Sequence, residues 1–169
     1  DIDGTINYNN LINYLAANED RNKLILRYLL KDKQEYNLIL SQRIEHLISV
    51  YNLLPNELKE KAVLLNSKMS KNSRKQAILK MQAGEKNYMF ATYSLAKEGL
   101  DIKRLNRLHL ILPTKDKAVV QQSVGRIRRK SEKDKKAIVF DYVDDFIKSQ
   151  KDFKTRKNFY KNINCEVFD

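Results

Sequence analysis

The feature that most constrains the fold is a series of five short apolar runs, each of strand length and each followed by a segment of different character. Strands that are apolar throughout, rather than on alternate residues, are typical of parallel sheets buried on both faces. We therefore predict an α/β fold in which helices cover both faces of a parallel sheet. The predicted strands are Tyr36–Leu40, Ala62–Leu65, Asn87–Thr92, Leu108–Leu112 and Ala137–Tyr142.

Helical periodicity fills most of the intervals between these strands. The stretch from Thr92 to Leu108 is predicted as a loop, and the helix over Ser73–Ala83 is predicted to begin at a cap, Asn72 or Ser73, and to end at Gly84. The other predicted helices are two short ones within Asn10–Leu30, one over Arg43–Leu54, one over Lys117–Arg129 and a lysine-rich one within Val143–Tyr160.

Charge and composition narrow the class of partner. The chain of 169 residues has 33 Lys and Arg against 21 Asp and Glu, a formal net charge of +12, which predicts attraction to a polyanion. No apolar run approaches the roughly 20 residues that cross a bilayer, and no basic helix has a bulky apolar face, so we expect no membrane partner. Cys165 is the only cysteine, which excludes an intrachain disulfide and a cysteine-cluster zinc site, and we expect an intracellular protein.

The most informative segment is VVQQSVGRIRR, residues 119–129. On a helix, Val120 and Val124 share one face with an isoleucine, while Gln122, Arg126 and Arg129 lie near the opposite face. Two forked, permanently charged guanidinium groups on one exposed face suit phosphate oxygens, although the same pattern also fits a solvated basic helix. A glycine within the helix costs about 1 kcal/mol, which favours a close approach by backbone or ligand.

This segment, read as Gln-x-x-Gly-Arg-x-x-Arg, resembles the sixth conserved motif of superfamily 2 helicases, and ATYSLAKEGLDI, residues 91–102, resembles the fifth. The resemblance implies the second RecA-like domain of such an enzyme, closest in pattern to phage and bacterial DNA helicases of the UvsW and RadD kind. It implies that Arg126 and Arg129 reach the triphosphate of ATP, that Gln122 helps to orient them, and that Gly99 and Asp101 line the same cleft.

The same resemblance implies residues that face a nucleic-acid backbone. LILSQR, residues 38–43, is similar to the fourth motif, and LLNSKMS, residues 64–70, follows the next strand. Hydroxyl, amide and cationic groups at strand ends suit phosphate contacts that do not depend on base sequence. The implied contacts are Ser41, Gln42, Arg43, Ser67, Lys68 and Thr92.

The chain contains neither a phosphate-binding G-x-x-x-x-G-K-[ST] loop nor a D-E-A-[DH]-like string for Mg²⁺. We therefore expect ATP and Mg²⁺ to be bound mainly by a first RecA-like domain upstream of Asp1, and the fragment alone to be inactive. The expected division is a helical lead-in at residues 1–33, a RecA-like unit at 34–145 and a basic helical tail at 146–169. The resemblance favours DNA over RNA as the bound strand, and it predicts no metal site in this chain.

Two other functions compete with the helicase interpretation. DIDGT, residues 1–5, matches the signature of haloacid dehalogenase-like phosphatases, but that chemistry needs a buried strand before Asp1, and none precedes it in this sequence. The alternative from a different class is a non-catalytic nucleic-acid-binding module. Such a module explains the basic charge, but it gives no reason for paired arginines opposite a packing face.

Three aromatic or imidazole side chains are further candidates for functional groups. His46 and His109 each stand alone among apolar neighbours, which favours core or interface positions over acid–base catalysis. Tyr93 follows a predicted strand, where it could stack on a base or pack beneath the loop.

Overall fold

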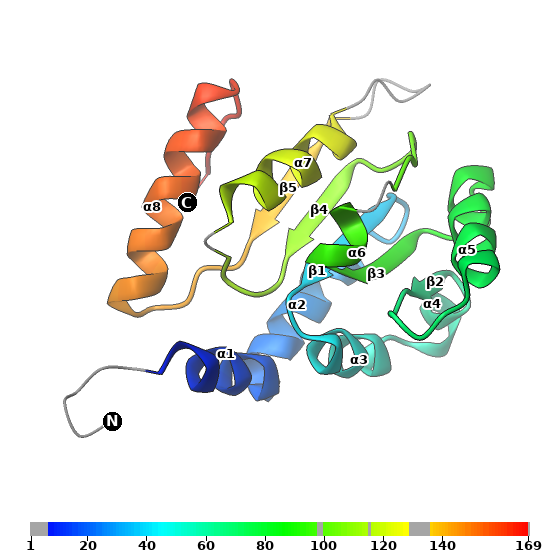
Figure 1. The fold of residues 1–169 in the computed structure, drawn as a ribbon, viewed down its shortest axis with the longest axis horizontal. Coiled ribbons are helices and arrows are strands. Elements are labelled where there is room, and N and C mark those ends of the chain that lie inside the picture. The colour runs from blue at the N-terminus through cyan, green and yellow to red at the C-terminus, as the bar shows by residue number, and fades with distance from the viewer. Residues whose placement is uncertain (1–6, 98–99, 115, 129–135, 169) are drawn as a thin grey trace.

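The computed structural model describes residues 7–97, 100–114, 116–128 and 136–168, and a five-stranded sheet forms its centre (Figure 1). All neighbouring strands are parallel, in the order β2-β3-β1-β4-β5. The predicted fold class is therefore confirmed. The strands are β1 (Asn37–Ser41), β2 (Ala62–Leu64), β3 (Tyr88–Thr92), β4 (Arg107–Leu110) and β5 (Ile138–Asp141).

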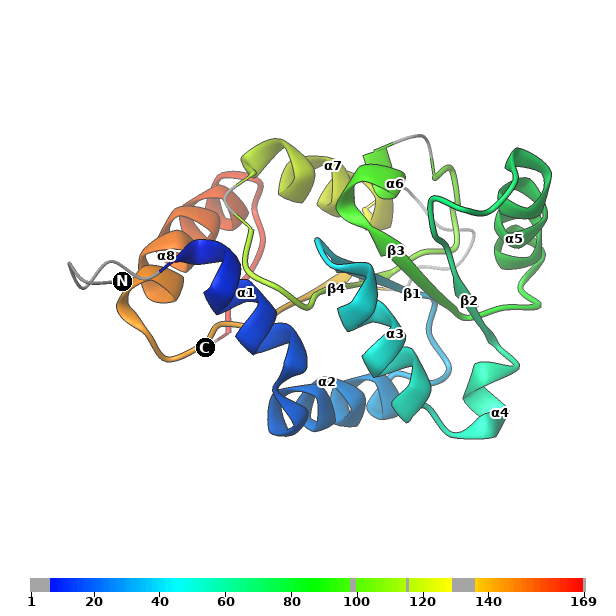
Figure 2. The same cartoon turned by 60° about the horizontal axis from the view of Figure 1, so that its bottom comes forward.

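Helices cover both faces of the sheet, as Figure 2 shows with α2 and α3 on one side and α6 and α7 on the other. Successive strand residues point to opposite faces, so Leu38 and Leu40 join one core cluster while Ile39 joins the second. The first cluster lies under α5 (Lys71–Ala83), α6 (Tyr93–Lys97) and α7 (Lys117–Ile127). The second lies under α2 (Glu19–Lys31), α3 (Ile44–Leu53) and α4 (Asn56–Lys59).

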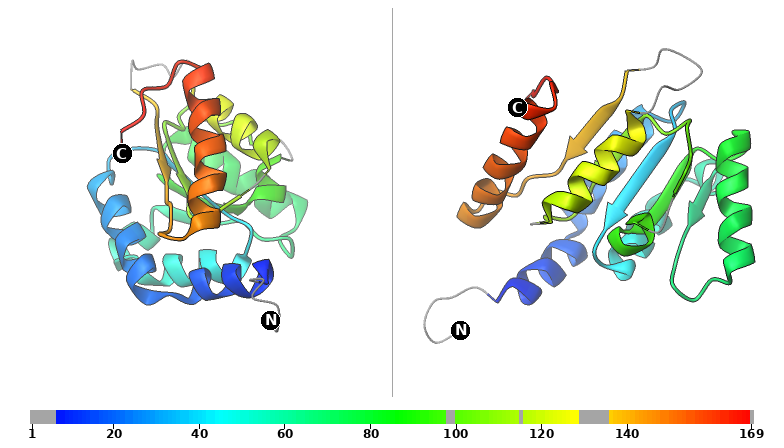
Figure 3. Two further views of the ribbon diagram at one scale, coloured as in Figure 1. Left: turned by 90° about the vertical axis from the view of Figure 1, so that its left-hand side faces the viewer. Right: turned by 45° about the horizontal axis from the view of Figure 1, so that its top comes forward.

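Helices near the beginning and end of the described chain also pack onto the sheet. Ile25 and Leu29 of α2 are completely buried in the core that includes β1, while α1 (Tyr8–Ala17) packs against Leu112 just after β4. The last helix, α8 (Ile147–Asn162), runs beside β5 and α7 in the views of Figure 3, and its Tyr160 belongs to the first core cluster. None of the described helices combines the length and apolar character needed to cross a bilayer.

Most element boundaries differ from the sequence prediction by one or two residues, the short helix α4 was not predicted, and two further differences have a clear physical reason. Helix α5 begins two residues early, because Ser70 is the cap and its hydroxyl accepts a hydrogen bond from the amide of Ser73 at 3.0 Å. Its end is as predicted, with Gly84 at φ +83°. The predicted loop after Thr92 begins instead with α6, a helix of five residues that is too short to leave a periodic pattern.

Candidate functional site

Helix α7 separates an apolar face from a polar face, as its sequence predicts. Val120, Val124 and Ile127 are buried against the sheet, whereas Gln122 and Gly125 are exposed. The carboxylate of Asp116 caps the helix by accepting a hydrogen bond from the amide of Val119 at 3.1 Å. The polar face is therefore held in place by burial on one side and by a cap at the amino end.

Arg126 lies on this polar face and is half-buried against the segment that follows β3. Its guanidinium group donates to the carbonyl of Ala96 at 2.6 Å and to the carbonyl of Leu100. The side chain therefore lies along α6 and the following loop and does not enter the hydrophobic core. The second predicted arginine, Arg129, lies outside the described residues.

The loop beside Arg126 carries the other predicted cleft residues. Asp101 is exposed, and its main-chain carbonyl accepts a hydrogen bond from the side-chain amide of Gln82 at 2.6 Å. Its neighbour Leu100 is buried, which anchors the loop to the core. Gly99 lies outside the described residues. The structure thus brings Arg126 and the Asp101 segment together on one surface.

Gly125 occupies open space within this surface. A Cβ atom added there would meet no heavy atom within 4 Å, once its chain neighbours and the backbone of its own helix are left aside. Packing inside the chain therefore does not require a glycine, although a glycine in a helix interior costs about 1 kcal/mol relative to alanine. The absence of the side chain leaves room for a group that approaches α7 from outside the chain.

The predicted nucleic-acid contacts gather at the carboxyl edge of the sheet, where parallel strands end together. Ser41 and Thr92 are register partners at the last positions of β1 and β3. Thr92 is half-buried, with its hydroxyl 3.2 Å from that of Ser94. Ser41 is completely buried, and its hydroxyl accepts from the amide of Arg43 at 3.1 Å. The expectation that Ser41 faces a strand is therefore wrong for this geometry, because every residue of β1 is covered.

Gln42 and Arg43 are half-buried and tie this edge to neighbouring segments. The Gln42 amide donates to the carbonyl of Pro113 at 3.1 Å, and the Arg43 guanidinium donates to the side-chain carbonyls of Asn9 and Asn13 in α1, both at 3.2 Å. Contacts with α1 were not predicted, because residues 9 and 43 are far apart in the sequence.

Ser67 and Lys68 are exposed on the turn after β2. The side-chain carbonyl of Asn66 orders this turn by accepting hydrogen bonds from the amides of Lys68 at 3.0 Å and Met69 at 3.1 Å. The ammonium group of Lys68 is thus presented to solvent at the same edge as Thr92.

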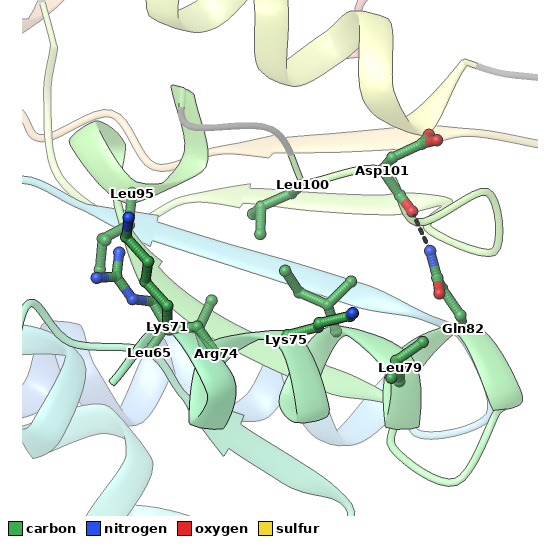
Figure 4. Close-up of a pocket in the computed structure, with 10 residues that line it drawn as sticks. Leu65, Lys71, Arg74, Lys75, Leu79, Gln82, Leu95, Leu100 and Asp101 are labelled. Carbon is green, nitrogen blue, oxygen red and sulfur yellow. Dashed lines mark hydrogen bonds between the residues drawn. The ribbon is translucent and has the colours of Figure 1, made fainter. Parts of the chain in front are cut away.

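A pocket of about 460 Å³ lies between α5 and the loop that carries Asp101 (Figure 4). Its apolar wall includes Leu65, Leu95 and Leu100, and its basic side chains come from the first turns of α5. These cations, Lys71, Arg74 and Lys75, were not singled out from the sequence. Their spacing of three and four residues places them on one side of α5, and that spacing was the signal available.

The two histidines are core residues, as predicted. His46 and His109 are both completely buried. Burial, with a smaller effect from a nearby guanidinium group, Arg21 for His46 and Arg107 for His109, lowers the pKa of each imidazole to about 3. Both rings are therefore neutral at physiological pH and are poorly suited to acid–base catalysis.

Tyr93 packs beneath the loop after β4 and does not face a base. Only 7% of its surface is exposed, and its hydroxyl donates to the carbonyl of Leu112 at 3.0 Å. Among the residues that the structure describes, no cluster of three or more His, Cys, Asp and Glu side chains is placed to hold a metal ion. The segments at residues 1–5 and 129–135, which include the DIDGT string, lie outside the described residues.

Comparison with known sequences places this geometry in context. A family model described as the helicase conserved C-terminal domain matches residues 20–131. The protein named "Putative ATP-dependent RNA helicase L396" of Acanthamoeba polyphaga mimivirus is 34% identical over 161 residues, which cover 92% of this chain and 29% of that protein. The "ATP-dependent DNA helicase uvsW" of Enterobacteria phage T4 is 24% identical over 154 residues, with 90% and 30% covered.

Solved structures show the same fold. The crystal structure of T4 UvsW matches with a TM-score of 0.74 at 20% identity, covering 94% of this chain and 36% of that one. Dbp5 of S. cerevisiae, solved bound to RNA and ADP BeF3, matches with a TM-score of 0.68 at 16% identity, covering 88% and 37%. This chain spans only 28% to 30% of the length of the curated relatives that it matches.

Proposed function

The chain belongs to the helicase C-terminal domain family of superfamily 2, and from that premise we propose that it is the second motor domain of an ATP-dependent helicase or translocase. The intact protein would carry a first RecA-like domain ahead of this one. That proposal fits the share of its relatives that the chain spans. Residues 1–33 would lead in from the first domain, 34–145 would form the motor unit, and 146–169 would form a basic tail.

The observation that carries the proposal is the surface shared by Arg126, Gly125 and the Asp101 segment. A guanidinium group has five N–H donors, and Arg126 directs two of them to the carbonyls of Ala96 and Leu100. We propose that these carbonyls aim the group, that the open space at Gly125 admits a triphosphate, and that Gln122 one turn earlier helps to orient it. Arg129 would add a second guanidinium, and Gly99 would line the cleft with Asp101.

ATP bound with Mg²⁺ supplies a γ-phosphoryl group whose transfer to water releases the free energy for movement. We assign the metal and most of the nucleotide contacts to the first domain. The contribution of this chain would be positive charge placed where negative charge accumulates on the phosphoryl oxygens during transfer.

We propose that the carboxyl edge of the sheet grips a nucleic-acid backbone. Lys68 and Ser67 are exposed there, and Thr92 is half-buried beside them in the sheet order. Arg43 and Gln42 contribute through side chains already fixed by α1 and Pro113. Such contacts recognise phosphate rather than bases, so the protein could hold a strand of any sequence. Closing and opening of the two domains would then move the protein along that strand.

Hydrolysis tests the first part of the proposal. In the full-length protein, Arg126→Ala is expected to lower the steady-state ATP turnover by about 10³-fold or more, as loss of an arginine finger does. Arg27→Ala is the matched control, because Arg27 is an exposed arginine on α2, across the sheet from α7. Turnover that survives Arg126→Ala would contradict the proposed role of Arg126, whereas a full-length protein with no ATP turnover at all would favour the non-catalytic nucleic-acid-binding module.

Salt dependence tests the second part. Lys68→Ala is expected to weaken binding to single-stranded oligonucleotides of any sequence and to reduce the slope of log affinity against log salt by about 0.7. Lys33→Ala is the control, because Lys33 is exposed at the opposite, amino edge of the sheet. Running the titration with DNA and RNA of one sequence tests the prediction that DNA is favoured, since the names of the relatives include both.

A further inference from the structure

The C-terminal helix α8 is joined to the end of the sheet by a buried ion pair. Arg156 is 3% exposed, and its guanidinium group contacts both carboxylate oxygens of Asp141, the last residue of β5, at 2.7 and 2.9 Å. The hydroxyl of Tyr160 donates to the same carboxylate at 2.8 Å. Burial by itself lowers the pKa of Arg156, but the hydrogen bonds to Asp141 and the attraction of its carboxylate outweigh burial and raise that pKa, so the guanidinium group stays charged.

The same arginine reaches the segment that starts α7. Its third nitrogen donates to the carbonyl of Thr114 at 3.1 Å. The hydroxyl of Thr114 accepts from the amide of Asp116 at 3.2 Å, and Asp116 is the residue that caps α7. The carboxylate of Asp116 also pairs with Lys97 of α6 at 2.9 Å. A continuous set of hydrogen bonds therefore runs from α8 to the first turn of α7 and on to α6.

A second link joins α8 to the other end of α7. Arg128, the residue that follows α7, donates to the carbonyl of Ile163, the residue that follows α8, at 2.8 Å. Arg126, the predicted phosphate-binding residue, lies between the two links.

We propose that Arg156 is a positioning residue for the proposed hydrolysis reaction, because α8 holds α7 at both ends and so fixes the place of Arg126 over Ala96 and Leu100. This inference rests on the proposed function of Arg126. It makes α8 part of the motor and not merely a basic tail. A guanidinium that is displaced by about 1 Å loses on the order of 10²-fold in rate, so the two links would matter to catalysis without touching the nucleotide.

The test uses the full-length protein and Arg156→Lys, which keeps the positive charge but loses the paired contact and the reach to Thr114. The expected result is a turnover number lower by roughly 10- to 100-fold with KM for ATP changed little, together with faster amide hydrogen exchange across residues 117–127. Arg107→Lys is the matched control. Arg107 also pairs with carboxylates while largely buried, but it does so at the start of β4, away from α7.

A double-variant cycle separates positioning from general stability. If Arg156 acts through Arg126, then adding Arg156→Lys to Arg126→Ala should lower turnover no further. The inference would be overturned if the two substitutions lowered turnover by the product of their separate effects, or if amide hydrogen exchange in α7 were unchanged by Arg156→Lys. Turnover that survives Arg126→Ala alone would instead overturn the proposed function.

A second variant guards against misfolding of the first. Arg128→Ala removes only an exposed link, so the protein should fold and still show faster exchange near the end of α7. Unchanged amide hydrogen exchange in this variant would contradict the inference that α8 holds α7 at both ends.

Discussion

Acidification from pH 7.0 to pH 5.0 should destabilise the domain through two buried imidazoles. The ring of His109 lies between the side-chain carbonyl of Asn37 at 3.1 Å and the hydroxyl of Tyr142 at 3.0 Å, and it stacks on Phe140 with centroids 4.4 Å apart. A carbonyl oxygen only accepts hydrogen bonds, so Nε2 carries the proton and Nδ1 accepts from the tyrosine. The neutral ring is thereby satisfied on both sides.

His46 repeats the arrangement, with Nε2 2.8 Å from the side-chain carbonyl of Asn22 and Nδ1 3.4 Å from the hydroxyl of Ser41. The pKa of each histidine falls from 6.5 to about 3 in the fold, chiefly through burial. At pH 5.0 the unfolded chain therefore binds protons that the folded chain does not. The contribution of the two neutral histidines to the free energy of unfolding is fully present above pH 6.5 and is lost as the pH falls toward 3.

The size of the effect follows from these pKa values. The unfolded pKa lies about 1.5 units above pH 5.0, and each unit corresponds to about 1.4 kcal/mol, so each histidine should remove about 2 kcal/mol from the free energy of unfolding. Because the chain has 2 histidines, the total expected loss is about 4 kcal/mol. That loss is a large part of the free energy of unfolding of a typical domain, which is about 5–15 kcal/mol.

Urea unfolding followed by circular dichroism at the two pH values measures this loss. His46→Gln and His109→Gln should each halve the difference between pH 7.0 and 5.0, whatever constant cost each variant carries at both pH values. The double variant should show almost no difference. A wild-type stability that is unchanged between the two pH values would refute the reasoning, since it would mean that the folded imidazoles titrate normally.

Two further predictions concern single side chains. Gly125→Ala should stabilise the chain toward urea by up to about 1 kcal/mol, because the new methyl group meets no atom within 4 Å, yet it should slow ATP turnover in the full-length protein by obstructing the approach to α7. Unchanged turnover would argue against a ligand there. Leu29→Ala should cost about 2–5 kcal/mol because Leu29 is 0% exposed in the core, whereas Leu30→Ala next to it, 37% exposed, should cost far less. Equal losses in urea unfolding would show that α2 is not part of the core.

The sequence predicts the central strands well because β1, β3 and β4 are buried on both faces, which leaves continuous apolar runs at the right spacing. It predicts the two faces of α7 for a related reason, since Val120, Val124 and Ile127 must meet the sheet. Burial on both faces is also why the prediction for Ser41 is wrong. A polar residue at the end of such a strand is indistinguishable, by pattern alone, from one that emerges into solvent.

Contacts between distant segments could not be predicted from the sequence. Arg21 pairs with Asp144 at 2.6 Å across 123 positions, and Arg156 with Asp141 across 15. Each pair depends on where the sheet places its edge strand and not on a local pattern. The role proposed for α8 therefore comes from the structure, whereas the role proposed for Arg126 was already implied by its motif.

The most direct measurement of the central claim is a structure of the full-length protein with a non-hydrolysable ATP analogue and Mg²⁺. The account predicts nitrogens of the Arg126 guanidinium about 2.7–2.9 Å from γ-phosphate oxygens, with Gly125 facing the nucleotide. A bound analogue that lies away from α7, with Arg126 still donating only within its own domain, would contradict it.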